Sequence, residues 1–202
     1  MNEIRIIRAF FTKEFVRIYQ AYNRSIADCA VKNNKFISPP FKMERTTWIK
    51  PSFLWMMYRS GWALKPNQER ILAIDISHEG FLWALENSCT SSFDSLIYSS
   101  EKEWRIIKDS SLVVIQWDPE RDINMNKLAY RSIQIGLTPS STKLYVDKWT
   151  LNISDITDQV LKIHWLKSQN RIDEAKSILP HEAEYSIPPS IEKKIGINKF
   201  IN

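Results

Sequence analysis

Residues 47–62 read "TWIKPSFLWMMYRSGW", a stretch that holds three tryptophans, two methionines, a tyrosine and a phenylalanine beside Lys50 and Arg59. Pro51 favours the first position of a helix and Gly61 favours its end, so the stretch predicts a helix between them. Because this helix is apolar on nearly every side, we expect it at the centre of the fold. Lys50 and Arg59 then lie at its two ends, where their stems pack and their charged heads reach a surface or a cleft.

Alternating or continuously apolar segments rich in β-formers flank this helix and predict strands at residues 15–22, 45–50, 70–76, 112–118 and 130–137. Helical patterns follow at residues 23–33, 79–89, 154–169 and 171–180. Strands and helices do not alternate strictly, which favours an α+β fold with a mixed or antiparallel central sheet and packed helices. We expect the strands that contain Tyr19, Ile74, Ile115 and Ile133 to share that one sheet.

The length of 202 residues suits one domain. We expect residues 1–185 to form it, and residues 186–202, which are basic and broken by prolines, to form a loosely attached tail. No apolar run is long enough for a membrane and no secretory signal is visible, so we expect a cytoplasmic protein with reduced cysteines and no membrane partner.

Composition also excludes several classes of site. The chain has 4 glycines, and neither a Rossmann fingerprint nor a P-loop can be written with them. Its 3 histidines and 2 cysteines are too scattered for zinc spacing, so we expect no metal site. The net charge of +5 is compatible with a partner that carries phosphate.

Polar residues interrupt three of the predicted strands. Gln20 lies at the end of the first, Gln116 and Asp118 lie at the end of the fourth, and Gln134 lies within the fifth. Each has two interpretations: a satisfied residue at an edge or a solvent-facing side of the sheet, or a residue that lines a cleft. The residue pattern leaves both open.

The tryptophan-rich stretch has two interpretations as well. Arginine together with aromatic planes suits a ligand that has a flat base and phosphates. The alternative is a core helix whose two cations extend to solvent.

Five motifs together resemble one family, catalogued as domain of unknown function 4291. They are "RIYQAY" (17–22), "RTTWIKPSFLWMMYRSGW" (45–62), "VIQWDPERD" (114–122), "YRSIQIGL" (130–137) and "DITDQV" (155–160). The resemblance extends over residues 17–185, which is most of the chain. The family carries no established activity.

A second resemblance is to the ADP-ribosyltransferases, whose first strand carries a tyrosine followed by histidine or arginine. "YQAY" at residues 19–22 is similar, with Gln20 in place of the histidine or arginine. This resemblance implies an ADP-ribosyltransferase-like fold and an enzyme that cleaves NAD and transfers ADP-ribose to a nucleic-acid or protein acceptor. It implies Gln20 and Gln134 as catalytic residues. Residues that would bind the nucleotide are Arg17, Tyr19, Tyr22, Thr47, Trp48, Lys50, Tyr58 and Arg59.

A domain that binds a nucleotide or RNA without catalysis, through the same basic and aromatic cleft, is the alternative function. A structural or partner-binding domain is a third. The sequence leaves the acceptor and the oligomeric state open.

Overall fold

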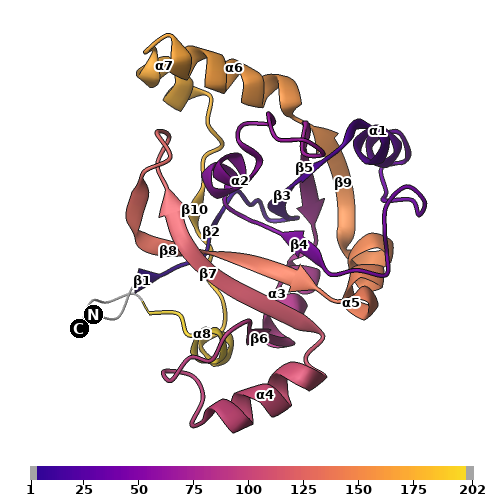
Figure 1. The fold of residues 1–202 in the computed structure, drawn as a ribbon, viewed down its shortest axis with the longest axis vertical. Coiled ribbons are helices and arrows are strands. Elements are labelled where there is room, and N and C mark those ends of the chain that lie inside the picture. Colours follow the sequence, from indigo (N-terminus) through magenta and orange to yellow (C-terminus); the bar gives the residue numbers. More distant parts are fainter. Residues whose placement is uncertain (1–3, 199–202) are drawn as a thin grey trace.

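The buried strand β5 (Arg70–Ile76) organises one half of the molecule, and six of its seven residues are buried. It pairs in antiparallel fashion with β3 (Val16–Tyr22) on one side and β9 (Thr150–Asp155) on the other. The computed structural model describes residues 4–198 (Figure 1). These three strands form a sheet of their own.

The second sheet is built on the hairpin of β7 (Val113–Arg121) and β8 (Lys127–Leu137). Strand β6 (Ser88–Thr90) lies parallel to β7, while β1 (Ile4–Arg5) and β4 (Thr47–Ile49) follow one another along the far edge of β8. The expectation of one shared sheet is therefore wrong. An isolated bridge, in which the Tyr19 amide donates to the Lys50 carbonyl at 2.7 Å, links the two sheets.

The three-stranded sheet separates two hydrophobic clusters. Leu72, Ile74 and Ile76 face the larger cluster, whereas Ile71 and Ala73 face the smaller one, as the alternation of a strand requires. Helices α1 (Arg24–Asn33), α3 (His78–Glu86) and α8 (Pro189–Ile195) contribute to the larger cluster. Helices α2 (Phe53–Ser60), α6 (Thr157–Ser168) and α7 (Ile172–Ser177) contribute to the smaller cluster.

Helix α2 is the tryptophan-rich helix, and its apolar residues are core residues. Phe53, Met56 and Met57 are buried in the smaller cluster. The hydroxyl of Ser52 accepts a hydrogen bond from the Trp55 amide, so Ser52 rather than Pro51 opens the helix. Gly61 ends it with a positive φ of 61°, a backbone conformation that favours glycine.

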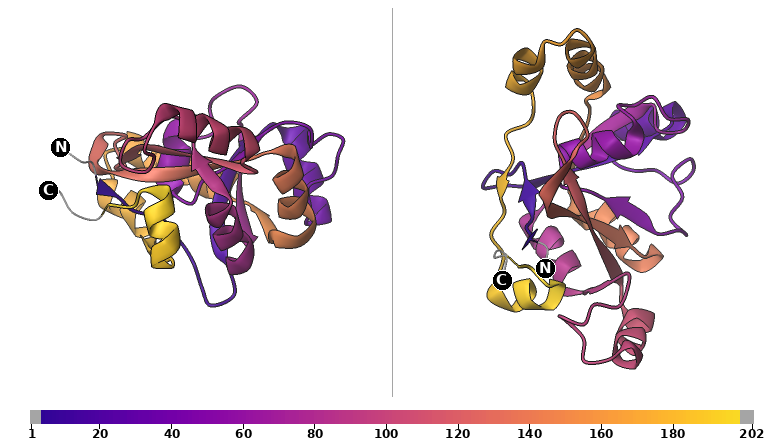
Figure 2. Two further views of the ribbon diagram at one scale, coloured as in Figure 1. Left: turned by 90° about the horizontal axis from the view of Figure 1, so that it is seen from below. Right: turned by 60° about the vertical axis from the view of Figure 1, so that its left-hand side comes forward.

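The two chain ends are joined by backbone pairing. Strand β2 (Arg8–Ala9) pairs with β10 (Ala183–Glu184), and the Arg5 amide donates to the Asn198 carbonyl at 2.8 Å. Figure 2 shows α8 and the N-terminal strands on the same side of the molecule. The expectation of a loosely attached tail is wrong as far as residue 198, because Ile191 and Ile195 lie in the main core. Residues 199–202 lie outside the described residues.

Several elements were also not predicted from the sequence, among them strand β9, helix α8, α4 (Glu101–Ser110), α5 (Pro139–Leu144) and the π-helical turn η1 (Tyr145–Trp149). The predicted class, α+β in a single domain with a mixed sheet and packed helices, is confirmed. None of the helices within residues 4–198 has the length and apolar character that a bilayer crossing requires.

Candidate functional site

A cavity of about 870 Å³ lies where the end of β3 meets β4 and the β7–β8 hairpin, so both sheets contribute to its walls. The start of α1, the loop that precedes β4, helix α2 and the loop that precedes β5 complete it. Seven of the ten site residues predicted from the sequence line this cavity: Gln20, Tyr22, Thr47, Trp48, Lys50, Arg59 and Gln134.

The cavity is strongly cationic. Lys42, Arg45, Lys50 and Arg59 line it, and no aspartate or glutamate among the described residues does. Helix α1 begins at the same wall with Asn23 as its cap, and its first turn holds no acidic residue. Helix N-termini carry partial positive charge, so backbone and side chains favour an anion here.

Lys50 is the buried cation of this set, with 6% of its surface exposed. Within residues 4–198 its ammonium group makes no hydrogen bond or ion pair; it lies 5.4 Å from the centre of the Trp55 ring. Burial and the neighbouring Arg59 lower the pKa of Lys50 from 10.5 to about 7, although Asp118 opposes that shift. A buried amine without a protein partner is costly to keep charged.

Gln20 lies on the wall of the cavity with both ends of its amide engaged. Its nitrogen donates to the Trp48 carbonyl at 2.9 Å, and its oxygen accepts from the Tyr145 hydroxyl at 2.8 Å. Tyr145 is fully buried, so this network fixes the orientation of the glutamine. Gln20 therefore ties β3 to β4 at the edge of the cavity.

Gln134 is held by two acceptors on the neighbouring strand β7. Its amide nitrogen donates to Gln116 Oε1 at 2.5 Å and to Asp118 Oδ2 at 2.7 Å. Gln116 and Gln134 are directly opposed in the hairpin, and both line the cavity. Burial raises the pKa of Asp118 above 3.8, while the Gln134 bond and the cations Arg131, Lys50 and Arg121 oppose the rise.

Trp48 supplies the aromatic wall. It is half-buried, and its indole ring lies so close to Gly136 that a Cβ there would be 3.0 Å from the ring carbons. The glycine opposite Trp48 in the sheet therefore gives the ring room to lie flat on β8. Tyr22 and Thr47, which also line the cavity, are buried.

Arg17 and Tyr19 lie away from the cavity, contrary to the prediction. Both are at odd positions of β3, so their side chains leave the strand on the side opposite Gln20. The Arg17 guanidinium pairs with both oxygens of Asp75, at 2.6 and 2.9 Å. Tyr19 is fully buried beside Phe53.

Tyr58 also lies outside the cavity. One residue along a helix turns the side chain by about 100°, so α2 can present Arg59 to the cavity while Tyr58 faces elsewhere. The Tyr58 ring lies under the Arg121 guanidinium, 3.8 Å from its carbon, and is exposed. The resemblance names both residues as nucleotide-binding, and the structure places only Arg59 at the cavity.

Sequence reasoning missed several residues of the cavity, among them Lys42, Arg45 and Gln68. They belong to loops, where no periodicity indicates a direction for the side chain. Gln116 could be found from the sequence, because it is a polar residue at the end of an apolar predicted strand.

The described part of the chain contains no cluster of three or more histidine, cysteine or acidic residues that could hold a metal ion. The fold and the cavity define a class of protein: an α+β domain with a cationic cleft between two sheets. The chain belongs to the family described as Domain of unknown function (DUF4291), whose family model matches residues 6–185. The sequence-based assignment to this family is thereby confirmed. No curated protein matches the chain.

Proposed function

We propose that the cleft binds a nucleotide through its phosphate groups. The observation that carries this proposal is Lys50, a buried ammonium group that lines the cavity and lacks an ion-pair partner among residues 4–198. A phosphate oxygen would supply that partner in a site of low dielectric, where a charge-assisted hydrogen bond is strong.

The other groups of the cavity suit the rest of such a ligand. Arg59, Lys42 and Arg45 are exposed and can reach further phosphate oxygens, and the first amides of α1 point the positive end of the helix at the cavity. Trp48 offers a flat apolar surface for a base. The volume of about 870 Å³ lies within the range of small-molecule sites.

NAD is the nucleotide that the resemblance to ADP-ribosyltransferases implies, and its cleavage is the catalytic form of the proposal. When nicotinamide leaves, positive charge develops on the ribose. The Gln116 oxygen, which lines the cavity, and the neighbouring Asp118 carboxylate both accept a hydrogen bond from Gln134, and they are the groups near this end of the cavity that can stabilise that charge. We also propose that the protein is located in the cytoplasm. In that reducing compartment the thiols of Cys29 and Cys89 remain free.

Titration calorimetry with NAD, ADP-ribose and AMP tests binding. Arg59→Ala should weaken nucleotide binding roughly 10-fold or more, because a hydrogen bond to a charged group contributes roughly 1.5–3 kcal/mol. The control Lys162→Ala removes an exposed lysine of α6 that lies outside the cavity and should bind like the wild type. Binding of none of the three nucleotides would refute the proposal.

Release of nicotinamide from NAD tests catalysis. Gln134→Ala should slow the release by roughly 100-fold or more, since one oriented group at a charged transition state contributes roughly 2.7–4 kcal/mol. The control Gln169→Ala changes an exposed glutamine at the end of α6. Nucleotide binding without any nicotinamide release would instead favour the alternative function, a domain that binds a nucleotide or RNA without catalysis.

A further inference from the structure

A second cavity, of about 510 Å³, adjoins the first on the other side of Gln116. Its walls come from Arg5, from the last residue of β6 and the segment 91–95 that follows it, and from β7 and β8. Strand β6 ends at Thr90, so the outer edge of β7 at residues 116–118 opens into this cavity instead of pairing with a strand.

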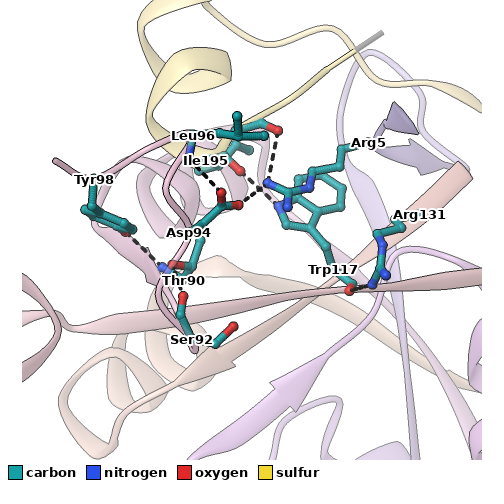
Figure 3. Close-up of polar contacts among 10 residues, drawn as sticks. Arg5, Thr90, Ser92, Asp94, Leu96, Tyr98, Trp117, Arg131 and Ile195 are labelled. Atoms are coloured by element: carbon teal, nitrogen blue, oxygen red, sulfur yellow. Dashed lines mark hydrogen bonds and ion pairs between the residues drawn. The ribbon is translucent and has the colours of Figure 1, made fainter. Parts of the chain in front are cut away.

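The walls of the second cavity are tied together across distant parts of the chain (Figure 3). Arg5 forms an ion pair with Asp94 at 2.6 Å. The Trp117 indole donates to the Ile195 carbonyl at 2.9 Å, and Arg131 donates to the Trp117 carbonyl at 2.6 Å. The cavity is therefore formed by the fold itself and does not depend on a ligand to order it.

The chemistry of the second cavity differs from that of the first. Its two arginines, Arg5 and Arg131, are matched by two aspartates, Asp94 and Asp118, so it lacks the positive excess that favours phosphate. Hydroxyl side chains form much of the remaining wall: Thr90, Ser91, Ser92 and Ser95. Balanced charge with many hydroxyl groups suits a neutral ligand that itself carries hydroxyl groups, such as a sugar.

Three side chains connect the two cavities. Gln116 lines both, Gln134 lines the first and Asp118 lines the second. The Gln134 amide donates to Asp118 Oδ2, whereas Oδ1 of Asp118 makes no hydrogen bond within the described part of the chain. Oδ2 of Asp118 is thus hydrogen-bonded to a residue of the first cavity. Oδ1 is free to accept a proton from a ligand in the second cavity. Burial raises the pKa of Asp118, which makes it a better base than an exposed aspartate.

We propose that the second cavity is the acceptor subsite, that it takes a sugar hydroxyl, and that Asp118 accepts the proton of that hydroxyl. This inference rests on the proposed cleavage of NAD. The hydroxyl oxygen forms a bond to C1 of the ribose as the bond from C1 to the nicotinamide nitrogen breaks. The electron pair of the broken bond goes to that nitrogen and neutralises the pyridinium ring, while the hydroxyl proton passes to the carboxylate. No oxidant or reductant is required.

The test incubates the full chain with NAD and methyl β-D-riboside and measures the ADP-ribosyl riboside by mass spectrometry, alongside released nicotinamide. Ser92→Tyr places a ring in the second cavity at an exposed loop position and should abolish transfer to the riboside while NAD binding stays unchanged. Asp118→Asn should slow transfer by about 100-fold or more, the usual contribution of a general base. The control Ser168→Tyr, at the exposed end of α6, should transfer like the wild type.

Three outcomes separate the two proposals. If the wild type releases nicotinamide but forms no riboside adduct, the acceptor subsite is refuted and the cleavage of NAD stands. Undiminished transfer by Ser92→Tyr would refute the assignment of the second cavity. No binding of NAD at all would refute the proposed cleavage of NAD, and this inference with it.

Discussion

Replacing Lys50 by methionine should stabilise the fold and weaken nucleotide binding. Burial lowers the pKa of Lys50 from 10.5 to about 7 in the folded chain. Between these two pH values the unfolded chain binds the additional proton, so the stability of the wild type rises with pH by about 1.4 kcal/mol per unit from this group. Methionine has a similar length, fills the same space and carries no charge. The variant should therefore exceed the wild type by roughly 2–5 kcal/mol at pH 7 and by close to nothing at pH 10.5.

Urea unfolding of both proteins at pH 7 and pH 10.5 measures this difference. Lys162→Met, at an exposed position on α6, is the matched control and should change stability by no more than about 0.5 kcal/mol at either pH. A Lys50→Met protein that is less stable than the wild type at pH 7 would refute the reasoning. It would mean that the folded protein already stabilises the ammonium group and that no ligand is needed to do so.

Three further changes test other parts of the structure. Burial raises the pKa of Glu182 to about 8, so the stability that this carboxyl group contributes is complete below pH 4.5 and is lost as the pH rises through 8. Urea unfolding at pH 5 and at pH 9 tests this: between the two pH values, Glu182→Gln should lose less stability than the wild type loses. Gly80→Ala would place a Cβ 2.2 Å from Trp149 Cγ and should lower stability by roughly 1–3 kcal/mol, measured by thermal unfolding; an unchanged midpoint would contradict the packing of α3 on that ring. Arg17→Ala leaves the buried Asp75 carboxylate unpaired and should cost about 3 kcal/mol of stability, yet calorimetry should show unchanged nucleotide binding, because Arg17 lies outside the cavity.

The strands and helices near the site could be predicted from the sequence because the residue patterns that indicate them are local. Apolar residues alternate along β3, β5 is continuously buried, and Gly61 ends α2 with the conformation that its lack of a Cβ permits. Which strands pair with one another could not be predicted from these local patterns. Nothing in the pattern of β3 indicates that it pairs with β5 while the β7–β8 hairpin belongs to a second sheet.

The residues of the candidate site could likewise be predicted from the sequence only in part. Gln20 and Gln134 stood out as polar residues in apolar strands, and both line the cavity, but the sequence could not show that Gln20 is bound to Trp48 and Tyr145. Arg17, which the resemblance implies as a nucleotide-binding residue, pairs with Asp75 instead. A polar residue in a strand marks a place where a partner is needed, and only the fold decides whether that partner is a protein group or a ligand.

The pairing of the two chain ends determines when during synthesis the core can close. Arg8 and Glu182 are in contact although 174 residues separate them, and Ile7 belongs to the main core that α8 completes. Residues 7–9 are therefore synthesised long before their partners near residue 182, and their apolar side chains stay exposed in the interval. A chain cut short at residue 182 would keep every residue of the cationic cavity yet leave strand β2 without its partner β10.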